Sequence, residues 1–332
     1  MKPTDIAQPD YFHKVVDCQW ACPAHTPVPE YIRLIAQGRY DDAYLVNWKS
    51  NVFPGILGRT CDRPCEPACR RVRVEEGSPE HRKAHAKPEA VAICRLKRAA
   101  ADYKGDIRPH LPKPAAKGNG KRVALVGAGP ASLTVARDLA PHGYQCVVFD
   151  GDPKAGGMMR TQIPKFRLPD RVIDEECGYV LDLGVEFRAG TRVDSMAALL
   201  AEGYDAVFVG SGAPRGRDLD IPGRREAAKR IHIGIDWLSS VSFGHTTSIG
   251  KRVVVLGGGN TAMDCCRSAR RLGGEEVHVV VRSGFEEMKA SPWEKEDAMH
   301  EGIPIHNFLV PKAFLHDNGK LVGITFDKVA AK

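Results

Sequence analysis

The sequence predicts an α/β protein with an all-helical region at its N-terminus, and three observations predict it. From Lys121 onward, short apolar runs rich in β-branched residues alternate with helical stretches, as in a parallel sheet whose strands are buried on both faces. Glycine-rich turns join a strand to a helix at two places in this part. The first 104 residues have helical periodicity instead, as in Glu30–Leu45 and Ala90–Tyr103.

Composition sets the broad class. The chain has 332 residues, enough for two or three domains, and its 43% hydrophobic and 27% charged residues are typical of a globular protein. The polar start gives no sign of a signal peptide. No apolar run reaches the ~18–20 residues that a membrane span needs. We therefore expect a cytoplasmic protein that does not contact the membrane.

The charge is unevenly distributed. The net charge is +7, and residues 59–108 hold 13 Lys or Arg against 8 Asp or Glu. This excess could attract an acidic partner or could simply form a solvated surface. No aromatic-interleaved stacking motif accompanies it, so we expect no nucleic-acid binding.

The first glycine turn lies in residues 122–150, which read RVALVGAGPASLTVARDLAPHGYQCVVFD. Gly127 and Gly129 let a pyrophosphate approach the backbone, and the helix that follows directs its positive end toward the phosphates. Ser132 replaces the usual third glycine and is small enough for close helix–strand packing. Asp150 ends the second strand, where a carboxylate can accept hydrogen bonds from a ribose. These features together predict a nucleotide site.

The second glycine turn lies in residues 251–282, KRVVVLGGGNTAMDCCRSARRLGGEEVHVVVR. Gly257–Gly259 form the turn and Thr261–Leu272 the helix. The second strand ends in Arg282, with Lys289 on the next loop, and a guanidinium can hold a 2′-phosphate that a carboxylate would repel. We therefore expect NADP(H) rather than NAD(H); the alternative is that Arg282 only faces solvent. Two dinucleotide sites imply a nicotinamide that passes a hydride to a flavin.

Ten cysteines without a secretion signal argue against a disulfide framework. In the run 61–69, CDRPCEPAC, three cysteines stand four residues apart, and two prolines disfavour a continuous helix. A loop around a metal centre fits this run better. A proline follows Cys22, as after ligands in ferredoxin-type sequences. An iron–sulfur cluster is the favoured interpretation, and zinc or buried inert thiols are the alternatives. The clustered cysteines are Cys18, Cys22, Cys61, Cys65, Cys69 and Cys94.

Linker-like composition separates the two parts of the chain. Residues 105–120, GDIRPHLPKPAAKGNG, hold three prolines and three glycines.

Five motifs resemble those of a known family, in the same order, over nearly all of the chain. They are GRTCDRPCEPAC, VGAGPASLTVA, AGGMMRTQIPKFRLP, VFVGSGAPRGRDLDIPG and GGGNTAMD. The family includes the small subunit of glutamate synthase, the N-terminal half of dihydropyrimidine dehydrogenase and the large subunit of NADH-dependent ferredoxin–NADP oxidoreductase.

The resemblance implies the domain organisation and the site residues. It places a helical [4Fe-4S] domain at 1–104, a linker at 105–120, a Rossmann-like, doubly wound FAD domain at 121–245, and an NADP(H) domain, inserted in the FAD domain, at 246–332. No side chain receives a catalytic role. The residues implied for FAD are Gly127, Gly129, Pro130, Ala131, Ser132, Asp150, Gly157, Met158, Arg167 and Val193. Those implied for NADP(H) are Gly258, Gly259, Asn260, Thr261, Arg282, Ser283 and Lys289.

The same resemblance makes Cys22, Cys61 and Cys65 ligands of one [4Fe-4S] cluster. The usual fourth ligand of the family is a Glu or Gln, but Lys97 stands at that position, and a protonated lysine cannot ligate iron. Cys94 lies one helical turn earlier on the same face, and we expect it to take this role.

The second cluster of the family lacks part of its ligand set in this sequence. Only Cys18 and Cys69 remain for it, because the upstream C-x-x-C of the family is missing here. That cluster is absent, or is completed by other ligands or by another chain.

The C-terminal part of the FAD domain is also expected to be missing. In the family this domain resumes after the NADP(H) domain and ends with a G-D motif near the flavin, and no such segment follows Arg282. We expect a fragment, or a chain completed by a partner, that binds FAD weakly by itself.

The resemblance implies an electron-transfer oxidoreductase that connects NAD(P)H, FAD and a [4Fe-4S] cluster with a partner, either a larger subunit or a ferredoxin, in a hetero-oligomer. One alternative is a non-catalytic, flavin-poor docking subunit. Another is a self-contained reductase like thioredoxin reductase, but its C-x-x-C pair is absent from the α/β part, where Cys265 and Cys266 are adjacent.

Overall fold

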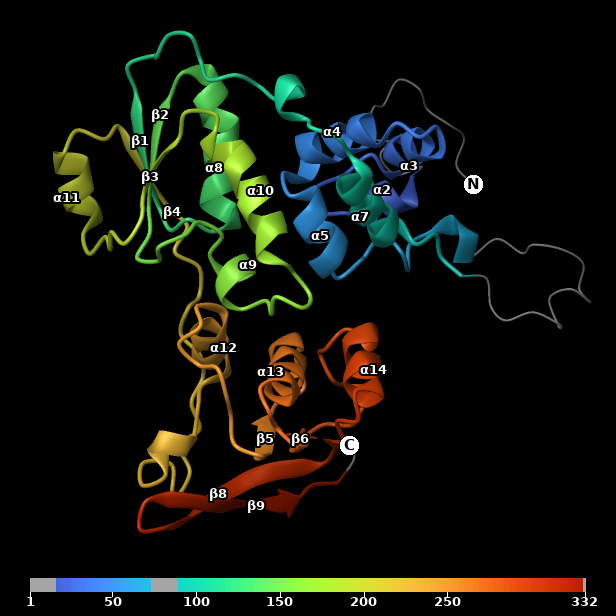
Figure 1. Cartoon of the computed structure of the whole chain (residues 1–332), viewed down its shortest axis with the longest axis vertical. Helices are drawn as coiled ribbons and strands as arrows, with labels where there is room; N and C mark the ends of the chain where they lie inside the picture. Colours follow the sequence, from blue (N-terminus) through green and yellow to red (C-terminus); the bar gives the residue numbers. More distant parts are fainter. Residues whose placement is uncertain (1–15, 73–88, 331–332) are drawn as a thin grey trace, which may run out of the picture. The chain divides into compact units, whose positions relative to one another are not determined.

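The computed structural model describes residues 16–72 and 89–330 (Figure 1). The chain divides into two compact units. The domain bounds expected above stay a prediction. The first unit consists of Met1–Leu125, Ala131–Gly151 and Asp170–Phe208, and the second of Val126–Pro130, Asp152–Pro169 and Val209–Lys332.

Helices dominate the described N-terminal residues, as predicted. The expectation of one helical stretch over Glu30–Leu45 is wrong in one respect: Gly38, with φ of 73°, follows the end of the first helix, and a second helix begins at Tyr40. No helix in the described part of the chain has the length and apolar character needed to cross a bilayer. The elements are α2 (Asp17–Ala21), α3 (Val28–Ala36), α4 (Tyr40–Asn51), α5 (Pro54–Thr60), η1 (Arg70–Val72) and α7 (Ile93–Tyr103).

The cysteine-rich region has a small core of its own, which includes Tyr31 and Cys94. Helix α5 packs closely on α7, because a Cβ on Gly58 would lie 2.7 Å from the backbone of Arg98. Only glycine permits this approach without a shift of one helix. The approach matters because Cys61 directly follows α5 and Cys94 lies in α7.

The segment predicted as a linker is anchored in this structure. Within residues 105–120, the short helix η2 (Arg108–His110) is flanked by Ile107 and Leu111, whose side chains are buried. Both belong to a core cluster that also contains Tyr44 and Tyr179. Apolar burial therefore holds this segment in place.

The first sheet confirms the predicted α/β pattern. Its strand order is β3-β2-β1-β4, and β2 pairs in parallel with β3. The central residues of β1 and β2 are buried, as expected for covered strands. Strand β4 differs because it lies at the edge of the sheet, where Val209 is 53% exposed. The elements are β1 (Arg122–Val126), α8 (Pro130–Leu139), η3 (Ala140–His142), β2 (Gln145–Phe149), α10 (Asp170–Leu181), β3 (Glu186–Arg188), α11 (Met196–Ala201) and β4 (Ala206–Val209).

The second sheet is parallel and has the order β5-β6-β7. Helices α12, α13 and α14 contribute to its core, in which Met263 and Ile303 are almost fully buried. The expectation that the strands are buried on both faces is also wrong for β5, which lies at the edge of this sheet, because its Val254 is 45% exposed. The elements are α9 (Met158–Thr161), η4 (Ala228–Arg230), α12 (Gly234–Ser242), β5 (Arg252–Leu256), α13 (Asn260–Arg271), β6 (Glu276–Val280), α14 (Pro292–His300) and β7 (Ile305–His306).

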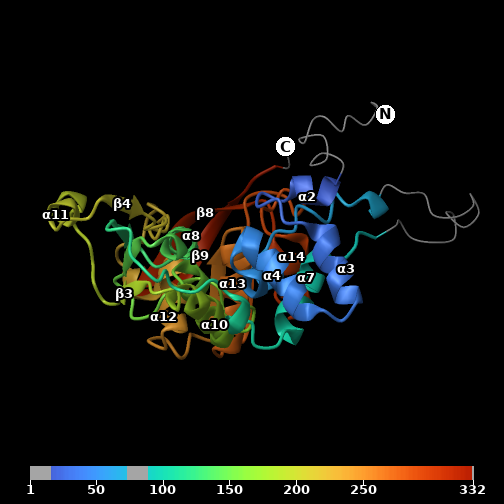
Figure 2. The ribbon, with the colours of Figure 1, turned by 90° about the horizontal axis from the view of Figure 1, so that it is seen from above.

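A β-hairpin that we did not predict follows β7. Strands β8 (Leu309–Asp317) and β9 (Lys320–Lys328) pair antiparallel and lie side by side in both views (Figures 1 and 2). The turn between them is Asn318-Gly319, with φ of 46° and 82°. An Asn-Gly pair between two apolar runs is a strong hairpin signal and could have predicted this element.

Candidate cofactor sites

The first glycine turn requires glycine at Gly127. Its φ is +94°, and a Cβ there would lie 2.5 Å from the carbonyl oxygen of Gly210. The Gly210 N–H in turn donates to the carbonyl of Val126, at 2.8 Å. The turn is therefore packed on one side against the chain that follows β4.

The other side of this turn approaches the segment around Gly157. A Cβ on Gly157 would lie 2.7 Å from the Cα of Gly129, and the Gly156 N–H donates to the carbonyl of Ala128, at 2.8 Å. A Cβ on Gly129, in contrast, would meet only the Cα of Gly157, at 3.9 Å. Gly129 is itself buried, in close contact with the segment around Gly157.

Helix α8 begins at Pro130, directly after this turn, and runs for ten residues. Ser132 is fully buried in its first turn, and its hydroxyl has no hydrogen-bond partner among the described residues. A glycine turn that leads directly into a helix N-terminus fits a pyrophosphate. Ala131 is exposed in the same turn of the helix.

Asp150 follows β2, and its main chain is fixed. Its N–H donates to the Arg188 carbonyl at 3.2 Å, and its carbonyl accepts from the Thr191 N–H at 2.7 Å. Asp150 is half-buried, at the strand end where a ribose contact is expected. Val193, also expected at FAD, is half-buried a few residues after β3.

The remaining residues expected at FAD lie in the segment 157–167. Met158 begins α9 and is 49% exposed. The guanidinium of Arg167 forms ion pairs with the carboxylates of Asp264 and Glu294. The sequence analysis missed these two partners, although Asp264 ends the quoted motif GGGNTAMD. The FAD role of Arg167 stays a prediction.

The second glycine turn differs in its packing. A Cβ on Gly258 would lie 2.9 Å from Cγ1 of Val281, so glycine is needed here for packing on the loop after β6. A Cβ on Gly259 would meet no atom within 4 Å, which leaves its backbone open to a ligand. Helix α13 begins at the next residue, Asn260, and Thr261 is exposed in its first turn. The open backbone and the helix start fit a dinucleotide phosphate.

The loop after β6 carries the basic residues expected at a 2′-phosphate. Arg282 and Lys289 are exposed, and Ser283 is half-buried. The loop is tied to the glycine turn, since the Ala290 N–H donates to the Gly258 carbonyl at 2.9 Å. Two exposed cations beside this turn fit a phosphate dianion.

The side chain of Asn260 also connects the loop after β6 with the second glycine turn. Its Oδ1 accepts from the Ser291 N–H at 2.8 Å, and its Nδ2 lies 3.3 Å from the Ser291 hydroxyl. Asn260 is thus held by the loop that ends before α14.

The structure brings three of the predicted cluster ligands together. Cys65 and Cys94 are buried in one small core, and Cys61 packs against it. The neighbouring Cys94 thiol lowers the pKa of Cys61 to about 6 and also lowers the pKa of Cys65, whereas those two sulfurs raise the pKa of Cys94. The Arg63 N–H donates to Sγ of Cys61 at 3.3 Å, a contact that stabilises a thiolate.

Two further side chains surround these thiols. Lys97, which is almost fully buried, contributes to the lowered pKa of both Cys61 and Cys65 through its positive charge. Tyr31 has no exposed surface, and its hydroxyl donates to the Ile93 carbonyl at 3.1 Å. Burial, followed by the nearby thiolates, raises the pKa of Tyr31.

Of the other three cysteines, Cys18 packs against the same core. Burial, followed by the charges of Cys69 and Cys65, raises the pKa of Cys18. The thiol of Cys22 donates to the hydroxyl of Thr26, at 3.5 Å. In the described part of the chain, no three His, Cys, Asp or Glu side chains are arranged to hold a single metal ion. The shared core of Cys61, Cys65 and Cys94 and the N–H bond to Cys61 nevertheless suit a thiolate-bound cluster.

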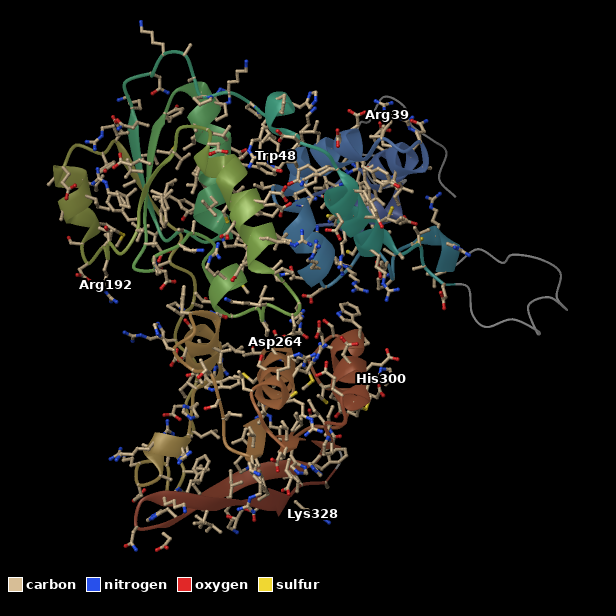
Figure 3. The ribbon with its side chains drawn as sticks, viewed as in Figure 1. Arg39, Trp48, Arg192, Asp264, His300 and Lys328 are labelled. Carbon is tan, nitrogen blue, oxygen red and sulfur yellow. The ribbon has the colours of Figure 1, made fainter. Side chains whose placement is uncertain are left out.

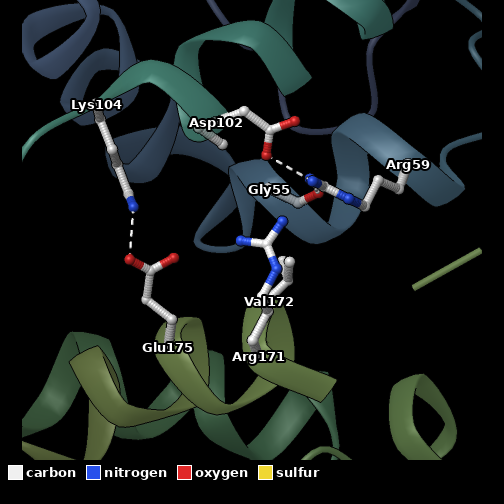
Figure 4. Close-up of a pocket in the computed structure, with 8 residues that line it drawn as sticks. Gly55, Arg59, Asp102, Lys104, Arg171, Val172 and Glu175 are labelled. Carbon is white, nitrogen blue, oxygen red and sulfur yellow. Dashed lines mark hydrogen bonds and ion pairs between the residues drawn. The ribbon is translucent and has the colours of Figure 1, made fainter. Parts of the chain in front are cut away.

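A separate polar cavity of about 160 Å³ lies between α5, α7 and the start of α10 (Figure 4). Two ion pairs line it, Arg59–Asp102 at 2.5 Å and Lys104–Glu175 at 2.6 Å. The guanidinium of Arg171 also points into it (Figure 4). None of the residues predicted to bind a cofactor lines this cavity, so it is distinct from the candidate cofactor sites.

Two family models match the chain. One, described as pyridine nucleotide-disulphide oxidoreductase, matches residues 121–329. The other, described as dihydropyrimidine dehydrogenase domain II, 4Fe-4S cluster, matches residues 12–108. The boundary between the two matches falls within the segment 105–120.

Curated relatives cover almost the whole chain. It is 35% identical to the NADPH-Fe(3+) oxidoreductase subunit beta of Geobacter sulfurreducens, over 98% of this chain and 48% of that protein. It is 32% identical to the glutamate synthase [NADPH] small chain of Escherichia coli, over 92% of this chain and 65% of that protein. The chain thus spans about half the length of the Geobacter relative.

Among solved structures, the chain is similar to FprA of Mycobacterium tuberculosis in complex with NADPH. The TM-score is 0.53 at 19% identity, over 63% of each chain. This likeness confirms the predicted α/β fold.

Proposed function

Because the chain belongs to the pyridine nucleotide-disulphide oxidoreductase family, we propose that it is an electron-transfer subunit that connects NADP(H) with a partner protein through FAD and a [4Fe-4S] cluster. Both family matches agree with the predicted resemblance and with an oxidoreductase that uses nucleotide and iron–sulfur cofactors. The observation that carries the proposal is the presence, in one chain, of two strand–glycine turn–helix units and a small core that gathers Cys61, Cys65 and Cys94.

The residues of the chain bind and orient the cofactors in this proposal. The glycine turn at Gly127–Gly129 and the start of α8 would receive the FAD pyrophosphate, and Asp150 the ribose. Arg282 and Lys289 would hold the 2′-phosphate of NADP(H). FAD, when bound, supplies the exchange between hydride and single-electron chemistry. No side chain needs to act as a nucleophile or as a general base.

The cluster would be held by Cys22, Cys61, Cys65 and Cys94. The shared core of the last three supports this set. The Cys22 thiol contacts Thr26, and its role as a ligand rests on the sequence resemblance alone. One cluster per chain is the proposed content.

The partner is proposed to be a larger oxidoreductase subunit or a ferredoxin, in a hetero-oligomer. Two relatives are named as a subunit beta and a small chain, which supports this part of the proposal. A cytoplasmic location is also proposed, and it is supported by ten cysteines that form no disulfide.

Cofactor counting tests the proposal. The chain is purified anaerobically, iron, sulfide and flavin are measured per chain, and NADPH is added while the flavin absorbance is followed. We expect about four irons per chain and flavin bleaching by NADPH. Iron-free protein, or flavin that NADPH does not bleach, would contradict the proposal. About eight irons would show that a second cluster is present.

A further inference from the structure

Arg167 is the centre of a buried charge cluster outside the glycine turns. Its Nη1 lies 2.7 Å from both carboxylate oxygens of Asp264, and its Nη2 lies 2.7 Å from Oε1 of Glu294. The three side chains are 12%, 6% and 5% exposed. Asp264 lies on α13 (Figure 3) and Glu294 on α14, so one guanidinium connects two helices.

A second arginine completes the cluster. Arg267 of α13, whose side chain is 8% exposed, donates from Nη1 to Oε2 of Glu294 at 2.9 Å. Two buried carboxylates thus face two guanidinium groups. Buried charges are tolerated only when they are paired, so loss of either carboxylate would leave a buried cation without full compensation.

The chain around Arg167 connects the two predicted nucleotide sites. Residues 156–168 include Gly157, which packs against the first glycine turn at Gly129. Near the end of the same segment, Arg167 contacts α13 through its ion pair with Asp264. Its Phe166 ring supports this contact, because the guanidinium of Arg271 lies 3.9 Å from the ring centre. All of these residues belong to one compact unit.

We propose that Asp264 and Glu294 are positioning residues that act through Arg167. These two carboxylates fix the segment 156–168 on helix α13. The segment is predicted to lie at the flavin, and the N-terminus of α13 is predicted to lie at NADP(H). The segment thereby links the first glycine turn, at Gly129, to helix α13. This inference rests on the proposed function. Hydride transfer needs its reacting atoms within ~3–3.5 Å, so a small displacement of this segment is costly for the rate.

Four variants of the whole protein, with its cofactors as isolated, test the connection: Arg167→Gln, Asp264→Asn, the double variant, and Arg224→Gln as the control. Arg224 forms a 2.7 Å ion pair with Asp218, and its side chain is 16% exposed, comparable to that of Arg167. The measurements are hydrogen exchange of peptides within 156–168, the rate of flavin bleaching by NADPH, and the Kd of NADP⁺.

In Asp264→Asn we expect faster exchange across 156–168 and a bleaching rate lower by roughly ten- to a hundredfold. The Kd of NADP⁺ should stay within about twofold, because this interaction does not contribute to ground-state binding. The double variant should be no worse than Arg167→Gln, because Asp264 acts through Arg167. Arg224→Gln should behave as the wild type in all three measurements.

Unchanged exchange in Asp264→Asn would overturn the inference, and so would additive losses in the double variant. A rise in the Kd of NADP⁺ that matches the loss in rate would also overturn it, because Asp264 would then act in cofactor binding. If Asp264→Asn does not fold, Arg167→Lys replaces it: an ammonium is a point charge that cannot engage both carboxylates as the fork does, so exchange should again rise. Wild-type flavin that NADPH does not bleach would refute the proposed function, whereas the exchange data would still decide whether the connection exists.

Discussion

Replacement of Glu176 by glutamine should change how the stability of the chain depends on pH. Glu176 lies on α10 and is 1% exposed. Its Oε1 accepts from the Tyr44 hydroxyl at 2.7 Å and from the Gly55 N–H at 2.6 Å, and its Oε2 accepts from the Ile56 N–H at 3.0 Å. Desolvation outweighs these three bonds and raises the pKa of Glu176 from 4.5 to about 7.

The size and sign of the effect follow from this shift. The difference between 4.5 and about 7 corresponds to about 3 kcal/mol. The folded chain holds the proton more tightly than the unfolded chain does. Glu176 therefore contributes its full stability below pH 4.5, and this contribution is lost as the pH rises through 7. Glutamine is neutral at every pH, so the variant should gain about 3 kcal/mol relative to the wild type across this interval.

Thermal unfolding followed by circular dichroism at several values from pH 5 to pH 8 measures the difference. A change of 1 kcal/mol in the free energy of unfolding shifts the melting temperature by about 2–4 °C in a domain of roughly 150–250 residues. The melting temperature of Glu176→Gln should therefore rise by several degrees relative to that of the wild type as the pH rises. Glu186→Gln, which removes an exposed carboxylate paired with Arg188, is the control and should show no such trend.

Parallel melting curves for the wild type and Glu176→Gln from pH 5 to pH 8 would refute the reasoning. They would mean that Glu176 stays ionised throughout, so that its three hydrogen bonds fully offset the desolvation of its charge.

Three further predictions concern the cofactor sites. Cys94→Ser should reduce the iron content below the level of one cluster, whereas Cys146→Ser, which removes a buried thiol of β2, should leave the iron count unchanged. Arg282→Ala should weaken NADPH binding by roughly ten- to a hundredfold and leave NADH binding unchanged, because loss of a charged phosphate partner costs about 1.5–3 kcal/mol; equal losses in both titrations would contradict this. Gly127→Ala should lower the melting temperature, since its Cβ would lie 2.5 Å from a carbonyl oxygen, whereas Gly259→Ala should keep the wild-type melting temperature and lose affinity for NADPH.

Local chemistry made several features predictable. Gly127 has a positive φ and lies directly between a strand and a helix, so the strand–turn–helix unit could be recognised from residue types alone. The β-branched runs became strands for the same local reason. Burial could not be predicted strand by strand, because position in the sheet decided it: Val254 is exposed since β5 is an edge strand.

The sequence by itself determined the two glycine turns, the grouping of the cysteines and the class of fold, because each of these depends on the chemistry of residues close together in the chain. Only the tertiary structure decided which cysteines touch and which charges pair. Cys61 packs against the core that contains Cys94 because α5 packs on α7. Arg167 pairs with Asp264, 97 residues away, and the two side chains are buried together. Such partners are selected by the cost of burying an unpaired polar group, and that cost exists only once distant segments have packed.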